Sequence, residues 1–469
     1  MTWEEIDARA RVLATELSER GAGPTAGVAY DGPTALDAVV LARACLEAGT
    51  PLTILPRALR AGATSTVGDH ALRATAPALI SRQGTLEPWG GGATRTDGED
   101  EDDDPPCVVQ LTSGSTGPPT SHVVRRSQLA YQATATQRRS RYEPTDHLVS
   151  WLPLYHDMGL IAFLLTPMVL GLDLTLVDPA TFARQPLSWP RLIDACQGTV
   201  TAAPQFAYSM LARRLAASGA DLSSLRIAYN GAEPVQVEAS TRFADAAATG
   251  CGFDPRALLP VYGLAEATLA VTIPPPGTGV RAVRRNGVVD ALLGPPLDGT
   301  EIRIRPLEGD DVPDADDLAG EVEVASPSVT TPAGAQGPPE WLATGDLGRL
   351  HEGELVVTGR LKEIIIVAGQ NVAPHVIEVA VQAVPDVRPG GVAAVALANG
   401  ADTQAIGVMV ETRRPSDALA RTVADAVEAA VGSRPAKVEL AEPGSIPKTT
   451  SGKIRRAAVA AHMGGEVQP

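Results

Sequence analysis

The sequence predicts an α/β fold in which helices cover parallel sheets, followed by a smaller α+β region towards the C-terminus. Three observations support this prediction. Short apolar segments alternate with helical patterns, several apolar segments run directly into loops of glycine and polar residues, and strand-like and helical segments resume near the C-terminus. At 469 residues the chain is too long for one compact core, so two or three domains are expected.

The N-terminal elements are predicted from local patterns. Thr2 and Glu5 form a capping box that begins a helix with an apolar face. A second helix is expected over 35–46, and short strands over 52–55 and 107–111. This alternation is typical of parallel sheets covered by helices.

Later segments extend the same pattern. Apolar segments at 225–229 and 258–261 are predicted strands, and each leads into a loop rich in glycine and polar residues. Ligands of open α/β sheets bind at the carboxyl ends of strands, so these loops are candidate sites. Towards the C-terminus we expect two strands and two helices, over 354–357, 363–367, 374–384 and 417–431.

Composition limits the possible partners. The chain is 44% hydrophobic and 20% charged, as in globular proteins. Its formal charge of −16 comes from 55 Asp+Glu against 39 Lys+Arg. This charge argues against broad binding to nucleic acid or anionic membranes, because both bind positively charged protein surfaces.

The location predicted from the sequence is the cytoplasm. The four cysteines are far apart in the sequence and are expected to be free thiols. The acidic N-terminus lacks the order of a signal peptide. The longest apolar stretch, 159–172, is too short to span a bilayer and contains Pro167, so it is expected to be a buried helix.

A loop of hydroxyls and glycines follows the strand predicted at 107–111. Its backbone N–H and hydroxyl groups suit phosphate oxygens, although the Walker pattern is absent. The alternative is a flexible surface loop. The candidate phosphate ligands are Thr112, Ser113, Gly114, Ser115, Thr116 and Gly117.

Three further candidates are carboxylates or a histidine in the large N-terminal part. His156 lies in the apolar run 151–160, where it is either a satisfied core residue or the entrance of an apolar pocket. Glu233 and Glu266 each follow a predicted strand and a glycine. Glu266 is a candidate Mg²⁺ ligand, since this ion prefers oxygen; helix capping is the alternative for both carboxylates.

The remaining candidates lie further along the chain. Asp346 after Gly345, with Arg360 nearby, is placed to bind ribose hydroxyls, unless it is an ordinary turn residue. The basic segment 447–456 is either a solubilising tail or a means of bringing the ammonium of Lys453 to a developing negative charge.

In this order and spacing the motifs resemble the adenylate-forming superfamily of acyl-CoA synthetases, peptide-synthetase adenylation domains and luciferases. The resemblance covers nearly the whole chain and is strongest to fatty acyl-AMP ligases. It rests on the segments 152–160 (LPLYHDMGL), 203–208 (APQFAY), 221–226 (DLSSLR), 230–234 (NGAEP) and 262–269 (YGLAEATL).

The resemblance implies roles for individual residues. The loop from Thr112 to Gly117 would hold the ATP phosphates, Glu266 would hold Mg²⁺, and His156 would stand at the acyl pocket. Lys453 matches the lysine that bridges the substrate carboxylate and the α-phosphate. The residues implied at the adenine are Gly231, Ala232, Glu233 and Tyr262, and those implied at the ribose are Asp346 and Arg360. Gly263, Leu264 and Ala265 are also implied in binding the nucleotide.

The resemblance also implies the domain organisation and the reaction. Residues 1–360 would form the adenylation domain and 361–469 a small domain that swings about Lys362. A carboxylic acid, fatty or related, would react with ATP to give an acyl-adenylate and pyrophosphate. The acyl group would then pass to the pantetheine thiol of a carrier protein.

Four departures from the family pattern leave the acceptor open. Thr120 stands where the phosphate loop usually carries a lysine, and the region before Thr2 is short. The span 269–294 is brief where fatty acyl-AMP ligases carry an insertion linked to refusal of coenzyme A, and 367–374 (VAGQNVAP) resembles general acyl-CoA synthetases. Coenzyme A, a non-thiol acceptor such as an amine or nitrite, and a non-catalytic nucleotide-binding descendant therefore remain alternatives.

Overall fold

The structure is a computed structural model. It describes residues 1–33, 36–55, 79–82, 85–88, 104–112, 120–285, 288–307, 320–332, 337–367, 370–398, 404–448 and 454–464.

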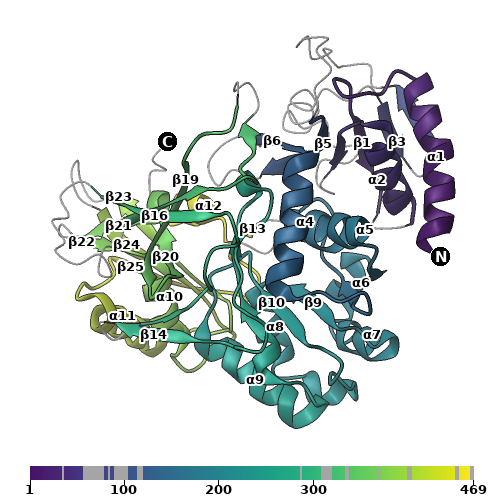
Figure 1. Ribbon diagram of the computed structural model, residues 1–469. Coiled ribbons are helices and arrows are strands. Elements are labelled where there is room, and N and C mark those ends of the chain that lie inside the picture. Colours follow the sequence, from purple (N-terminus) through teal and green to yellow (C-terminus); the bar gives the residue numbers. More distant parts are fainter. Residues whose placement is uncertain are drawn as a thin grey trace.

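A seven-stranded sheet, with strand order β18-β6-β5-β2-β1-β3-β4, lies beside the N-terminal helices (Figure 1). The pairs β1–β2, β1–β3 and β2–β5 are parallel, as predicted. The predicted capping box between Thr2 and Glu5 is confirmed at the start of the first helix. The elements are α1 (Trp3–Glu19), β1 (Val28–Asp31), α2 (Leu36–Ala48), β2 (Leu52–Ile54), β3 (Leu79–Arg82), β4 (Thr85–Pro88), β5 (Pro106–Thr112), β6 (Thr120–Arg125) and β18 (Thr331–Pro332).

The second sheet is entirely parallel, in the order β11-β10-β9-β7-β8. Every residue of β9 and β10 is buried, as expected for strands covered on both faces. Its strands and neighbouring helices are α4 (Arg126–Ser140), β7 (His147–Ser150), β8 (Asp173–Leu176), α6 (Pro179–Arg184), α7 (Ser188–Cys196), β9 (Val200–Ala203), α8 (Gln205–Leu211), η3 (Leu215–Ser218), β10 (Ile227–Asn230), α9 (Val237–Cys251), η4 (Pro255–Ala257) and β11 (Leu258–Pro260).

The apolar stretch at 159–172 is a buried helix, as predicted. It consists of the π-helix η2 (Met158–Leu165) and α5 (Thr166–Leu170). Phe163 packs in the core of the second sheet, whereas Ile161 and Leu164 pack in the core of the first. The helix is apolar on all sides because it lies between two cores. Within the described residues, no helix has the length and apolarity needed to cross a bilayer.

An antiparallel sheet in the order β16-β17-β19-β20 follows, with two hairpins beside it. Its core includes Val322, Val324 and Leu355, together with Val271 of the first hairpin. The elements are β12 (Tyr262–Gly263), β13 (Ala270–Thr272), β14 (Ala282–Arg285), β15 (Val288–Ala291), β16 (Glu301–Pro306), β17 (Gly320–Ala325), β19 (Leu342–His351) and β20 (Glu354–Arg360).

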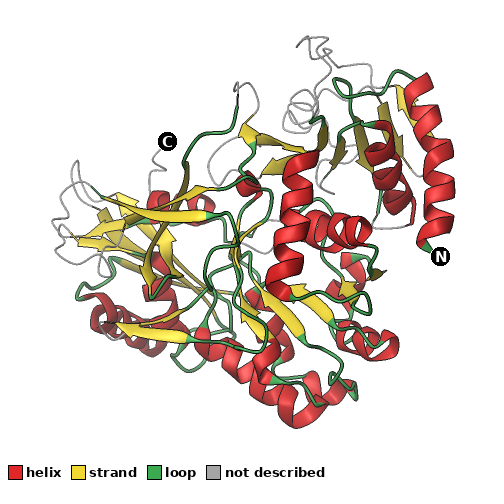
Figure 2. Ribbon diagram, viewed as in Figure 1, coloured by secondary structure: helices red, strands yellow, loops and turns green. Residues whose placement is uncertain are grey.

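The C-terminal part builds a separate hydrophobic core around the sheet β23-β24-β25, which Figure 2 shows with helices beside it. The strand predicted from Glu363 begins only at Ile365, because Glu363 belongs to the preceding single turn η6; the other predicted C-terminal elements are confirmed. The elements are η6 (Leu361–Glu363), β21 (Ile365–Val367), β22 (Gln370–Val372), α10 (Pro374–Gln382), β23 (Val392–Ala398), β24 (Gln404–Glu411), α11 (Asp417–Val431), β25 (Lys437–Ala441) and α12 (Arg456–His462).

Candidate active site

Glu266 lies at the tip of a tight hairpin between β12 and β13. The backbone N–H of Leu264 donates to the carbonyl of Leu269 at 2.8 Å, and Ala265–Ala267 form a single turn, η5. Gly263 is required here, because a Cβ at this position would lie 2.0 Å from the carbonyl oxygen of Leu269. The hairpin leaves the Glu266 side chain 34% exposed, so its carboxylate can reach a ligand.

Thr268, two residues after Glu266, has a strained backbone. Its φ of +65° and ψ of −50°, with a hydrogen bond of 2.7 Å from the Leu269 N–H to the Ala267 carbonyl, define a γ-turn. The Thr268 hydroxyl donates to the Ser328 carbonyl at 2.7 Å, and the Gln110 amide donates to the Thr268 carbonyl at 2.9 Å. These contacts from two other segments hold a conformation that β-branched residues rarely adopt.

His122 on β6 is the neighbour of Glu266 that the sequence did not single out. Its Nε2 lies 3.8 Å from Oε1 of Glu266, and its Nδ1 lies 3.2 Å from the hydroxyl of Thr330. The Thr330 N–H in turn donates to the Glu266 carbonyl at 2.8 Å. Burial lowers the pKa of His122, although the Glu266 charge opposes this shift. The sequence feature that could have drawn attention to His122 is Thr120, two residues earlier, which replaces the usual lysine of the phosphate loop.

The residues around Glu266 fit a divalent cation that also contacts a substrate. Across the described ranges, no group of three or more His, Cys, Asp and Glu side chains is placed to hold a metal ion. A single partly exposed carboxylate is nevertheless how proteins commonly bind Mg²⁺, with phosphate oxygens and water completing the coordination.

Tyr262, Asp346 and Arg360 form a second polar group. The Tyr262 hydroxyl donates to Oδ2 of Asp346 at 2.7 Å, and Nε of Arg360 donates to Oδ1 at 2.9 Å. The Asp346 side chain is only 7% exposed, whereas that of Arg360 is 50% exposed. Burial, with the Asp346 charge beside it, raises the pKa of Tyr262 well above its usual range, so its hydroxyl remains a donor.

Asp346 lies within β19, not at the strand end that the sequence suggested. Between Ala343 and Leu347 the register against β17 shifts, and Gly345 has a φ of +71°. Such a bulge lets the strand turn a side chain out of the regular alternation. Asp346 pairs directly with Arg360 on β20, which explains how residues from two strands meet.

The loop after β10 contains Gly231, Ala232 and Glu233. A Cβ on Gly231 would lie 2.8 Å from Cγ2 of Val261, and Ala232 has a φ of +65°. The Glu233 carboxylate accepts a hydrogen bond of 2.9 Å from the N–H of Phe206 in the first turn of α8. Glu233 therefore caps α8 rather than its own helix, and this contact fixes the loop.

The other predicted residues are only partly placed by the structure. His156 is half-buried between β7 and η2, with its ring 4.8 Å from that of Tyr155. Lys362 is exposed in η6. The candidates Ser113, Gly114, Ser115, Thr116, Gly117 and Lys453, and the side chain of Thr112, lie outside the described residues.

Described residues on either side of the segment that carries Lys453 hold the two ends of that segment together. Lys448 forms a bridge with Ile454, and the N–H of Arg455 donates to the Pro447 carbonyl at 2.9 Å. Arg456, the first residue of α12, forms ion pairs with Glu363 at 2.8 Å and Glu378 at 2.9 Å. Through Glu363, these pairs join the base of that segment to η6.

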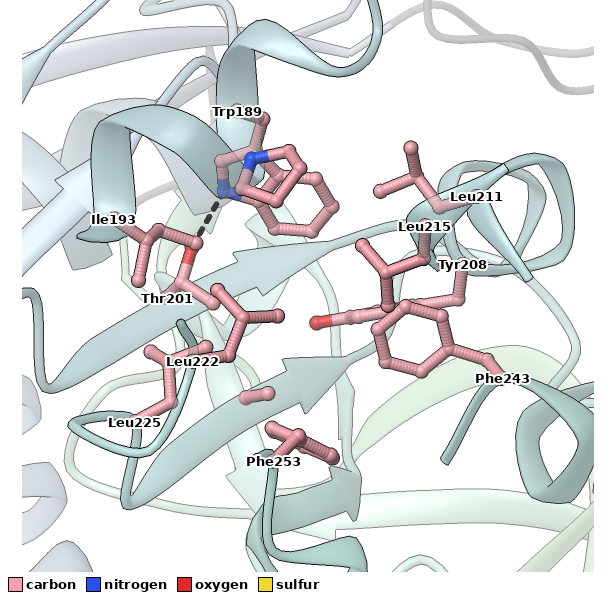
Figure 3. Close-up of a pocket in the computed structure, with 12 residues that line it drawn as sticks. Trp189, Ile193, Thr201, Tyr208, Leu211, Leu215, Leu222, Leu225, Phe243 and Phe253 are labelled. Carbon is pink, nitrogen blue, oxygen red and sulfur yellow. Dashed lines mark hydrogen bonds between the residues drawn. The ribbon is translucent and has the colours of Figure 1, made fainter. Parts of the chain in front are cut away.

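A small apolar cavity lies between the second sheet and helices α7 to α9 (Figure 3). Thr201 of β9 and Ala228 of β10 line it on the side of the sheet, and apolar side chains line it on the side of the helices. Its volume of about 10 Å³ holds at most about one water molecule. The cavity is therefore a packing void in the core and not a substrate pocket.

Comparison with known proteins identifies the family of the chain. Residues 64–332 match the family described as AMP-binding enzyme. The putative ligase Rv1013 of Mycobacterium tuberculosis is 40% identical over 75% of this chain and 70% of its own length. The long-chain-fatty-acid–AMP ligase FadD26 of Mycobacterium marinum is 32% identical over 98% of this chain and 90% of its own length.

A solved structure from a study of fatty acyl-adenylate ligases of E. coli and L. pneumophila has the same fold. It superimposes with a TM-score of 0.82 at 27% identity and covers 98% of this chain and 91% of that one. The fold and these relatives thus define an AMP-forming ligase, which uses ATP to adenylate a carboxylic acid. The chain belongs to the AMP-binding enzyme family.

Proposed function

We propose that this ligase activates a fatty or related acid with ATP and Mg²⁺, then transfers the acyl group to the pantetheine thiol of a carrier protein. The observation that carries the adenylation site is the pair of polar groups at the β12–β13 hairpin and at strands β19 and β20. One presents the carboxylate of Glu266, and the other presents Asp346 between Tyr262 and Arg360. The similarity to a long-chain-fatty-acid–AMP ligase supports the class of acid.

Each residue has a separate task in this proposal. Asp346 and Arg360 bind the ribose hydroxyls, and the adenine pocket is lined by Gly231, Ala232, Glu233 and Tyr262. Gly263, Leu264 and Ala265 also contribute to the ATP site. The loop from Thr112 to Gly117 holds the phosphates, and His156 stands at the acyl pocket. Glu266 holds Mg²⁺, which when bound offsets charge on the phosphate oxygens.

The chemistry is an in-line displacement. An oxygen of the substrate carboxylate forms a bond to the α-phosphorus, and the bond between that phosphorus and the oxygen bridging to the β-phosphate breaks. Pyrophosphate leaves with the bonding electrons. Lys453 contributes a cation beside the carboxylate and the α-phosphate, where negative charge accumulates. In the second step the carrier thiol loses its proton, its sulfur attacks the acyl carbon, and AMP leaves.

Replacing the proposed lysine tests the first step. We expect Lys453→Ala to lower acid-dependent pyrophosphate release by about a hundredfold or more, with ATP binding largely unchanged, since a preorganised cation acts mainly on the transition state. Lys448→Ala, at the base of the same segment, is the matched control. Equal pyrophosphate release in the Lys453 variant would remove that residue from the mechanism.

Coenzyme A is the second candidate acceptor. In the described part of the span between β13 and β16, the short hairpin β14–β15 is the only regular structure, and the segment 367–374 resembles acyl-CoA synthetases. Acyl transfer from a panel of acids, measured with holo carrier protein and with coenzyme A in parallel, separates the two. Charging of coenzyme A as efficiently as the carrier would contradict the carrier-only proposal, and a product with an amine would point to a non-thiol acceptor.

We further propose that residues 361–469 swing as a unit about Lys362, against residues 1–360. Two separate hydrophobic clusters support this division, since every member of both lies at or after Ile365. The proposed location is the cytoplasm, where ATP and carrier proteins are available.

A further inference from the structure

The part of the site around Glu266 contains possible metal-ligand atoms that the proposed Mg²⁺ site does not use. Nε2 of His122 has two oxygen neighbours: Oε1 of Glu266 at 3.8 Å and the hydroxyl of Thr120 at 3.5 Å. His122 is buried, whereas Glu266 is partly exposed. An imidazole nitrogen, a carboxylate oxygen and a hydroxyl oxygen thus converge from β6 and the Glu266 hairpin.

The hydrogen bonds of His122 determine which nitrogen carries the proton. The Thr330 hydroxyl lies 3.0 Å from the Glu266 carbonyl, which can only accept, so the hydroxyl donates its single hydrogen there. The same hydroxyl oxygen must then accept from Nδ1 of His122, 3.2 Å away. In the neutral ring, the lone pair therefore lies on Nε2 and faces the Glu266 carboxylate.

The separation of the two donors fits one shared ion. Ligands about 2.1 Å from a cation are about 3.0 Å apart in adjacent positions and about 4.2 Å apart in opposite positions. The 3.8 Å between Nε2 and Oε1 corresponds to neither position, but it is below the maximum of about 4.2 Å, so one ion can contact both atoms. Thr330 holds both sides of the pair, because it contacts Nδ1 of His122 and the backbone of Glu266.

We propose that Nε2 of His122 is a second protein ligand of the divalent cation held by Glu266, and that the site consequently prefers Mn²⁺ to Mg²⁺. Imidazole suits transition-metal ions, carboxylate suits both, and Mg²⁺ prefers oxygen alone. This inference rests on the proposed role of Glu266 at the ATP phosphates. Thr120 carries no charge, so it places no cation of its own beside the histidine.

A spectroscopic experiment on the full chain tests the ligand directly. Mn²⁺ and ATP are added without acid, so that no turnover occurs, and electron spin-echo modulation detects nitrogen bound to the Mn²⁺. Protein labelled with ¹⁵N-histidine distinguishes the imidazole from the adenine nitrogens. We expect a histidine nitrogen signal in the unaltered protein, and its loss in His122→Asn.

Matched variants separate coordination from structure. Asparagine at position 122 can keep a donor near Thr330 but lacks the ring nitrogen that faces Glu266. His147→Asn is the control, since His147 also lies on a strand with its Nε2 2.8 Å from a threonine hydroxyl, that of Thr175. We expect His122→Asn to weaken Mn²⁺·ATP binding about tenfold or more, with a smaller effect on Mg²⁺·ATP and none in the control.

The outcomes distinguish this inference from the proposed function. Tight Mn²⁺·ATP binding without a histidine signal overturns the role of His122 but leaves the ATP site intact. Failure of both metal–ATP complexes to bind overturns the metal role of Glu266 itself. If His122→Asn does not fold, the labelled, unaltered protein still decides the question.

Discussion

Two arginine–carboxylate pairs on strand β19 use the same chemistry for different purposes. Asp346 pairs with Arg360, whose side chain is 50% exposed, whereas Arg349 pairs with Asp290 at 3.1 Å and both are at most 8% exposed. Only three positions along the strand separate Asp346 from Arg349. Asp346 lies in the bulge before Leu347 and pairs with Arg360, whereas Arg349 lies after the bulge and opposite Val356.

The comparison shows how exposure decides what an ion pair can do. A pair with both members buried has no donor left for a ligand, so it contributes to the fold. In the other pair, a buried carboxylate is held in place while its arginine keeps donors that face solvent. Removing a partner should therefore damage stability in the first pair and nucleotide binding in the second.

The largest effect is expected from Arg349→Met. This change leaves Asp290 buried without its cation and should lower the free energy of unfolding by about 3–5 kcal/mol. Urea unfolding followed by circular dichroism measures the loss. The double variant with Asp290→Leu should recover most of it, because no uncompensated charge remains. A loss below about 1 kcal/mol in the single variant would show that this pair does not support the fold.

The next effect is expected from Asp346→Asn, and it should appear in activity. Loss of the carboxylate weakens charge-assisted hydrogen bonds at the ribose, so acid-dependent pyrophosphate release should fall about a hundredfold. The free energy of unfolding should change by no more than about 1 kcal/mol, since Arg360 can turn to solvent. Isothermal titration with ATP checks the cause. Unchanged ATP affinity would contradict the ribose role.

The smallest effect is expected from Asp146→Asn, at a third pair. Asp146 is buried and accepts from Arg226 and from the Thr199 hydroxyl at 2.7 Å. Burial raises the pKa of Asp146, but these hydrogen bonds outweigh it and the pKa is lowered. At pH 7 the substitution should cost about 2 kcal/mol of unfolding free energy, the size expected of a charge-assisted hydrogen bond.

The pH dependence of this third pair follows from the lowered pKa. Stability from the charged Asp146 is present above its ordinary value of 3.8 and is lost as the pH falls through the folded-state value. The difference between Asp146→Asn and the unaltered protein should therefore close only below about pH 4. A difference that stays constant down to pH 2 would show that the charge of Asp146 does not contribute.

Much of the fold could be predicted from local patterns. The capping box at Thr2, the helix at Asp417–Val431 and the buried helix after His156 all appear as expected. Such elements depend on neighbours within a few positions, so a short window contains their cause. The sequence also indicated the loops of the site, since glycines and polar residues follow the strands there.

The contacts within the site could not be predicted in the same way. His122 and Thr330 are 208 positions apart, and Tyr262 and Asp346 are 84 apart. Their approach depends on which strands become neighbours and on the bulge in β19, and a local sequence pattern predicts neither of these. The resemblance assigned Tyr262 to the adenine, but not its hydrogen bond to Asp346.

The sequence by itself therefore determined the class of fold, several of its helices and strands, and the loops that carry the candidate residues. Only the tertiary structure decided which of these side chains meet. It made Asp346 a buried carboxylate paired with an exposed arginine, buried Asp290 with Arg349, and placed His122 beside Glu266. The physical reason is that burial and hydrogen-bond partners depend on packing between distant segments, whereas propensity and capping act between near neighbours.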